Sequence, residues 1–307
     1  MSAPELIKEF KFYLRKMSCQ PATIESYSRD ALSLLNYLEN YGLSYAQVHP
    51  AIFKDFEKYL HNQLHDKPNT IRRMIIGARQ FFRFLVKQNY IEDSPLEYVV
   101  IPRREEDPSA SLSSEQLTLC LELCRKQDIC AKSTRDIAAF ALLAFEGIKA
   151  SELINIKWSD VTGLSDTSEL STSRSIFLTI HSSRKRSIAL SSESIIALSE
   201  YRIFYNEMQK NYPEKLQANF MFVGFQGRGG TQILPRLSRH GLKYILYEIG
   251  NLVGLNHLNT EILRHTAIAK FVAQGESVEN IMQRLGLRQA GNILKHLPKQ
   301  DIQNAAT

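Results

Sequence analysis

The chain has 307 residues, a formal net charge of +6 and a sequence pI near 9.0. Its apolar content of 44% and charged content of 23% are typical of a globular protein with two domains of ordinary size. No apolar run approaches the roughly 18 residues of a membrane-spanning helix, and the N-terminus lacks a signal-peptide core. We therefore expect a cytoplasmic protein without a membrane partner, and the basic balance favours a polyanionic partner such as nucleic acid.

The first 98 residues predict helices only, and we expect them to form one domain. Pro21 opens a helix with one broad apolar face that ends near Gly42. A second helix begins around Asn69, and its apolar side chains recur at helical spacing on one face. A different stripe of that helix carries Arg72, Arg79 and Arg83. These arginines indicate either a solvated face or a helix laid against DNA phosphates.

A polar segment with two prolines follows, and we interpret residues 99–112 as an interdomain linker. Ser113 and Gln116 have the spacing of a capping box, so a second domain is predicted to begin there and to include residues 113–307. Short β-type runs at 175–180 and 187–190 flank a basic turn, which predicts a hairpin. Helices are predicted at about 192–210, 238–252, 261–274 and 278–285. The fold class is therefore mainly α with a small β-sheet.

The cysteines do not predict a disulfide framework or a metal centre. Cys120 and Cys124 are one helical turn apart, but no pair of histidines accompanies them. We expect both thiols to pack in a core, and we expect the protein to hold no metal and no other cofactor.

Several short motifs follow one another in the second domain. Thr260-Glu261-Ile262-Leu263-Arg264-His265-Thr266 is followed by Leu285-Gly286 and by Asn292-Ile293-Leu294-Lys295-His296, and Gly147-Ile148-Lys149-Ala150-Ser151-Glu152-Leu153 precedes them. In this order and spacing the motifs resemble those of the tyrosine recombinases, or phage integrases, of the Xer type. The resemblance covers nearly the whole chain. It implies an N-terminal helical, SAM-like core-binding domain and a C-terminal domain of the tyrosine-recombinase catalytic type.

The resemblance also implies a reaction, in which a tyrosine attacks a DNA phosphate and two arginines clamp its oxygens. Of the four chemical positions in the C-terminal motifs, this chain keeps only Arg264. The nucleophile position holds His296, and no tyrosine occurs after Tyr247. Leu287 stands where a histidine would donate to the phosphate. Imidazole is a poor replacement for a phenol, so we expect His296 to be a surface or interface side chain.

Two further chemical positions of the family carry a cation: the first arginine and the lysine of the β-hairpin. In this chain the first position holds a lysine, and more than one residue could occupy the second. Lys149 replaces the first arginine and keeps the charge but loses the planar fork that grips two oxygens. The position of the hairpin lysine falls on His181, and Arg184 or Lys185 could supply the charge instead, because hairpins slip easily in register.

Glu261 stands where the family has a histidine facing the phosphate. A carboxylate about 4 Å from a phosphate would repel it by roughly 4 kcal/mol at an effective dielectric near 20. We therefore expect Glu261 to form an ion pair with Lys149 and Arg264 that fills the phosphate pocket. Arg264 is then predicted either to touch a phosphate or only to anchor Glu261.

Our leading hypothesis is a nucleoid-associated, DNA-binding relative of recombinases that does not cut DNA. The partner would be duplex DNA, with this chain or an active recombinase of a mobile element as a second partner, and the role would be accessory, architectural or regulatory. The predicted phosphate contacts come from Arg72, Arg73, Arg79, Arg83, Arg184, Lys185 and Arg186. One alternative is an active site-specific recombinase with an unusual active site. The other is a protein-interaction module without DNA binding, in which the arginines of the 69–89 helix are occluded or compensated.

Overall fold

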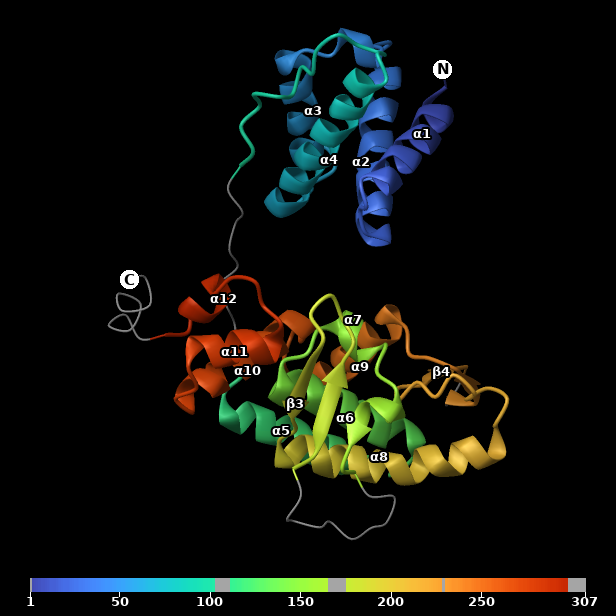
Figure 1. Cartoon of the computed structure of the whole chain (residues 1–307), viewed down its shortest axis with the longest axis vertical. Coiled ribbons are helices and arrows are strands. Elements are labelled where there is room, and N and C mark those ends of the chain that lie inside the picture. The colour runs from blue at the N-terminus through green and yellow to red at the C-terminus, as the bar shows by residue number, and fades with distance from the viewer. Residues whose placement is uncertain (1, 103–110, 165–174, 228–229, 298–307) are drawn as a thin grey trace. The chain divides into compact units, whose positions relative to one another are not determined.

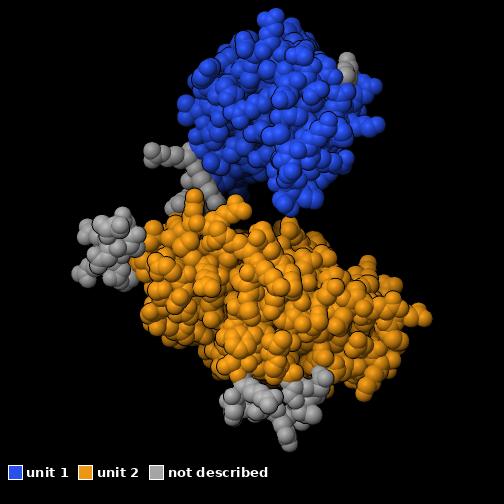
Figure 2. Space-filling model, viewed as in Figure 1, with its two compact units in different colours: residues 1–107 blue, residues 108–307 orange. Residues whose placement is uncertain are grey.

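The N-terminal helices and the C-terminal mixed domain form two compact units, residues 1–107 and 108–307 (Figure 2). The computed structural model describes residues 2–102, 111–164, 175–227 and 230–297. The division between the units falls within the predicted linker, of which residues 103–110 lie outside the described residues.

The N-terminal unit consists of helices that pack around aromatic side chains. They are α1 (Ala3–Lys16), α2 (Pro21–Asn40), α3 (Pro50–Asn62) and α4 (Pro68–Lys87), with a 3₁₀ turn at Tyr45–Gln47 (Figure 1). The last three of these helices begin with a proline, whose missing N–H would have no partner in a first turn. Phe10, Phe81 and Phe84 meet with ring centroids 5.3 to 6.0 Å apart in the fully buried centre. The apolar face predicted for the second helix lies in this core, because Ile75, Ala78, Phe82 and Leu85 of α4 are all buried and Ile71 packs partly against them.

The C-terminal unit is mainly helical and carries two small antiparallel sheets. Its helices are α5 (Ser114–Arg125), α6 (Ala131–Glu146), α7 (Ala150–Leu153), α8 (Ser192–Asn211), α9 (Arg239–Leu252), α10 (Thr260–Ala273), α11 (Val278–Leu285) and α12 (Gly291–Leu294). One sheet has the order β1 (Val161–Thr162), β2 (Phe177–Ile180), β3 (Arg186–Ala189), and the other pairs β4 (Gly224–Gln226) with β5 (Gln232–Leu234). The predicted fold class is confirmed, whereas the second sheet was not predicted.

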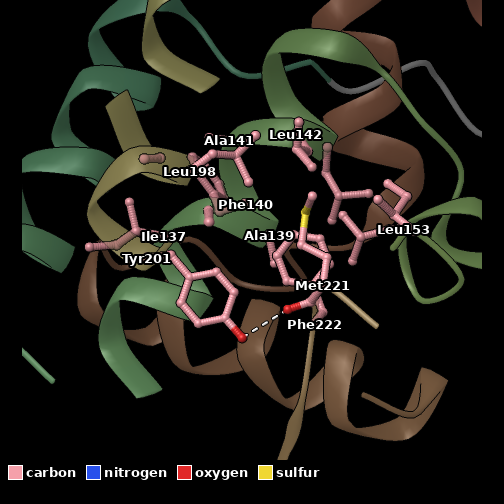
Figure 3. Packing of buried hydrophobic residues seen from close by; sticks show 14 of the residues in the cluster. Ile137, Ala139, Phe140, Ala141, Leu142, Leu153, Leu198, Tyr201, Met221 and Phe222 are labelled. Atoms are coloured by element: carbon pink, nitrogen blue, oxygen red, sulfur yellow. Dashed lines mark hydrogen bonds between the residues drawn. The ribbon is translucent and has the colours of Figure 1, made fainter. Parts of the chain in front are cut away.

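Helix α6 is the central element of this unit. Residues 137–145 are all buried, and α6 packs against both α8 and α10 (Figure 1). In the surrounding core the hydroxyl of Tyr201 donates a hydrogen bond to the carbonyl of Met221 at 2.9 Å (Figure 3). Cys120 and Cys124 are buried in the same core, as predicted, and burial raises the pKa of Cys120 to about 11 and that of Cys124 to about 12. None of the described helices is both long and apolar enough to cross a membrane.

Candidate functional site

A buried ion pair joins the first motif to the hairpin. The guanidinium of Arg186 donates from Nη1 and Nη2 to the two carboxylate oxygens of Glu152, both at 2.9 Å. Burial raises the pKa of Glu152, but hydrogen bonds from Arg186 and from the backbone of Lys149 outweigh it and lower the pKa. Arg186 was predicted to contact DNA. Its side chain is 6% exposed and its Nε donates to the carbonyl of Arg284, so we remove it from the proposed DNA interface.

The glycine of the Leu-Gly motif allows this ion pair to form. Gly286 ends α11 with φ of +61°, a conformation that glycine adopts without steric cost. A Cβ at this position would lie 2.8 Å from Nη1 of Arg186. In this Leu-Gly motif, Gly286 therefore provides the left-handed turn and the space for Arg186, and Leu285 is fully buried in the core.

A second buried carboxylate was missed by the sequence analysis. Glu146 is fully buried at the end of α6 and accepts a hydrogen bond from Arg284 Nη2 at 2.6 Å. It also accepts from the backbone N–H and hydroxyl of Ser191, at 2.8 and 2.7 Å. The only local signal was a glutamate at the end of a long apolar run. Glu146 thereby ties α11 and the start of α8 to the central helix.

Arg264 is buried and holds two backbone carbonyls. Its Nη1 donates to Gly147 and its Nη2 donates to Leu285 at 3.0 Å, so the side chain joins the first motif to α11. Burial lowers the pKa of Arg264. Of the two predicted roles, the anchoring of Glu261 is not what the structure shows.

The predicted ion pair among Lys149, Glu261 and Arg264 is wrong. Within the described residues, none of the three forms an ion pair with another, and both Lys149 and Glu261 are exposed. The donors of Arg264 are engaged by carbonyls instead. Glu261 lies in the first turn of α10, after the N-cap Asn259, where the positive end of the helix dipole stabilises a carboxylate without a cation.

His296, at the nucleophile position, is paired with another histidine. Its Nε2 lies 3.0 Å from Nδ1 of His265, and the ring centroids are 5.2 Å apart. Burial lowers the pKa of both imidazoles, so both are neutral near pH 7 and one donates to the other. Ile293 of α12 is fully buried against α10 and α11. His296 is therefore half-buried within the C-terminal unit, where it contacts His265 of α10.

The hairpin brings together several of the predicted residues. His181 Nε2 lies 3.2 Å from Oδ1 of Asp160, and Arg184 Nη1 donates to the carbonyl of Leu287 at 2.6 Å. The side chain of Leu287 packs against the apolar cluster of α10 and α11. Lys185 is exposed and makes no ion pair or hydrogen bond within the described part of the chain. Its charge is therefore not compensated by any of the described residues.

The arginine stripe of α4 is neither a plain solvated face nor an open cationic surface. Three of its side chains hold residues 94–102, a segment that we call the strap. Arg72 Nε donates to the carbonyl of Pro102 at 3.0 Å, and Arg79 donates to the carbonyls of Leu96 and Val99. Arg83 donates to both carboxylate oxygens of Glu97, at 3.1 and 2.6 Å. The neighbouring Arg73 donates to Ser26 and to the buried carboxylate of Asp30.

The exposed face of α9 was not identified from the sequence. Tyr244 and Tyr247 on this helix are 54% and 61% exposed. Arg239, His240 and Lys243 are exposed on the same helix. Basic residues interleaved with aromatic ones at helical spacing were the available signal, and this pattern is typical of surfaces that bind nucleic acid.

Comparisons with known proteins agree with this architecture. Residues 111–293 match the phage integrase family, and residues 7–89 match the phage integrase N-terminal SAM-like domain. Tyrosine recombinase XerD of Rickettsia prowazekii is 25% identical over 287 residues, which cover 92% of this chain and 88% of the relative. Tyrosine recombinase XerC of Oceanobacillus iheyensis is 25% identical over 97% of this chain and 93% of its own. The structure of the XerH site-specific recombinase bound to difH is similar with a TM-score of 0.70 and 17% identity, over 100% of this chain and 84% of that one.

Proposed function

The chain belongs to the phage integrase family, and from that premise we propose that it binds duplex DNA without cutting it. The observation that carries this proposal is the pair formed by His296 and His265 at the position of the family's nucleophile. Strand cleavage in this family needs a hydroxyl that becomes a good nucleophile near the phosphate. A half-buried, neutral imidazole whose Nε2 is already hydrogen-bonded does not supply one.

The remaining groups around this position do not compensate for the missing tyrosine. The two Nη atoms of Arg264 donate to backbone carbonyls, and Lys149 offers a point charge instead of a bidentate fork. The exposed carboxylate of Glu261 opposes a phosphate nearby, by roughly 4 kcal/mol at 4 Å and an effective dielectric of 20. These features support binding of DNA at a distance from Glu261 rather than transition-state stabilisation.

We propose that the phosphate contacts come from the exposed cations of both units. In the C-terminal unit these are Lys185 and Arg184 of the hairpin and Arg239 and Lys243 of α9. In the N-terminal unit the exposed cation is Arg83 of α4, where Glu97 gives way to phosphate, and the half-buried Arg72, Arg73 and Arg79 lie beside it on the same helix. The net charge of +6 supports this proposal, as does the similarity to a recombinase whose structure contains its DNA substrate.

A non-cutting DNA-binding protein of this family would act as an accessory, architectural or regulatory factor. We propose that it works in the cytoplasm, on the nucleoid, beside an active recombinase of a mobile element or as an oligomer of this chain. Occupation of a recombination site without cleavage would then set where and when an active partner assembles.

A second candidate function is a protein-interaction module that has lost DNA binding. The observation that favours it is the compensation of the α4 arginines by Glu97, Asp30 and the carbonyls of the strap. Against it stand Lys185 and the basic residues Arg239 and Lys243 of α9, which form no ion pair with any of the described residues.

One experiment separates these functions. The full chain is titrated onto duplex DNA from the region that flanks its gene in a gel-shift assay, and onto a nicked suicide substrate that is then run on a denaturing gel. An active XerD serves as the positive control. We expect a salt-sensitive shift and no covalent adduct. An adduct that is lost in Lys149→Ala would show an active recombinase with an unusual site, and the absence of any shift at moderate salt would show an interaction module.

A further inference from the structure

The ion pair between Arg83 and Glu97 differs from the other ion pairs of the arginines discussed above. Both side chains remain exposed, by 44% and 40%, whereas the Arg186 and Glu152 pair is 6% and 4% exposed. The Arg73 pair is intermediate, because its carboxylate, Asp30, is 2% exposed. An exposed pair exchanges partners readily, since solvent screens it and no burial holds it in place.

We propose that Glu97 is an internal counter-ion that occupies the phosphate site of Arg83 and competes with DNA for it. The inference rests on the proposed DNA binding and adds to it a device that limits affinity. The carboxylate of Glu97 receives two parallel N–H bonds from the guanidinium, from Nε at 3.1 Å and from Nη2 at 2.6 Å. A DNA phosphate presents two oxygens to the same fork, so the two anions are alternative occupants of one site.

The strap stays in place when Glu97 leaves the site. Leu96 beside it is fully buried, and Val99 and Ile101 pack partly against the same core. Arg79 holds two carbonyls of the strap and Arg72 holds a third. Only the side chain of Glu97 therefore has to swing away, and exchange requires no unfolding of the segment.

The surface next to the ion pair has room for a phosphate. A hollow of about 450 Å³ is lined by Arg83, Val86, Asp93, Ser94, Glu97 and Tyr98. Among the described residues, the buried hydroxyl of Ser94 in this hollow has no hydrogen-bond partner. Asp93 contributes a second carboxylate to the hollow. It opposes an anion by its charge alone, because it forms no ion pair with Arg83 within the described residues.

These two carboxylates make a matched comparison. In the wild-type protein, Glu97 occupies the fork of Arg83 and keeps it from a phosphate, so Arg83 adds little to the release of counter-ions from the DNA. Glu97→Gln keeps the size and an acceptor but removes the charge. We expect it to raise DNA affinity roughly two- to fivefold, the range of an exposed ion pair. The slope of log affinity against log salt should steepen by about 0.9, one further phosphate contact.

The test measures DNA affinity of the full-length chain as a function of salt for the wild type, Glu97→Gln, Asp93→Asn, Arg83→Ala and the Glu97→Gln, Arg83→Ala double variant. Asp93→Asn should raise affinity less than Glu97→Gln and leave the salt slope unchanged. In the Arg83→Ala background, Glu97→Gln should have no effect, because its site is gone. Hydrogen exchange of residues 94–102 should be unaltered in Glu97→Gln, which excludes release of the strap as the cause.

Three results would overturn the inference while leaving DNA binding intact. They are an unchanged or lower affinity for Glu97→Gln, an equal gain for Asp93→Asn, and a gain that persists without Arg83. If the wild type and every variant fail to bind DNA, the proposed function itself is refuted, and this inference with it.

Discussion

Neutralising Glu152 should destabilise the C-terminal unit strongly. The Glu152→Gln variant leaves the guanidinium of Arg186 buried without a counter-charge, since both side chains are at most 6% exposed. Breaking a buried ion pair on one side costs about 3 to 5 kcal/mol. For a unit of roughly 200 residues, each kcal/mol lowers Tm by about 2 to 4 °C, so we expect a loss of roughly 6 to 20 °C. Differential scanning calorimetry of the whole protein measures this decrease in Tm.

The double variant Glu152→Gln, Arg186→Met provides the control. It removes both charges and leaves no buried charge unpaired, so its Tm should lie above that of Glu152→Gln alone. A loss below about 3 °C for Glu152→Gln would refute the argument, because the pair would then contribute no more than an exposed one.

The same pair predicts a pH dependence. The pKa of Glu152 in the folded protein lies below its ordinary value of 4.5, so between the two values the unfolded chain binds more protons. Its contribution to stability is therefore complete above pH 4.5 and is lost as the pH falls through the lowered pKa. In Glu152→Gln this part of the acid-induced loss of stability should be absent.

Two further changes test the site. Gly286→Ala should lower the free energy of unfolding by about 1 to 3 kcal/mol, because the new Cβ would lie 2.8 Å from Arg186 in a left-handed backbone. Gly275→Ala is the control, because Gly275 has a φ of +76° with open space around it, and it should cost less. Equal costs in the two variants would contradict the steric argument. NMR titration should give pKa values below the ordinary 6.5 for His265 and His296. Because both pKa values are lowered in the folded state, the contribution of the two histidines to the docking of α12 is complete above pH 6.5 and is lost as the pH falls through the lowered pKa values. Measured pKa values at or above 6.5 would refute the buried pair.

The local elements of this protein follow from short stretches of its sequence. The apolar spacing of the 69–89 segment predicted α4 and its core face, and the predicted capping box is present, with Ser113 and Gln116 bonded to each other's backbone at 2.9 and 3.2 Å. The predicted helix at 278–285 has the bounds of α11. Helix periodicity and caps act over only a few residues, so the sequence carries their signal directly. The short strands β4 and β5 carry too little periodicity to be predicted.

The sequence also identified the family and the residues at its chemical positions, because a motif needs only residue identity and spacing. Which side chains contact each other was decided by the tertiary structure alone. Arg186 pairs with Glu152 across 34 positions and Arg284 with Glu146 across 138. Arg264, expected to pair with Glu261 on its own helix, donates instead to carbonyls that other elements bring to it. A guanidinium accepts any well-placed oxygen, and the placement of those oxygens depends on how distant segments pack.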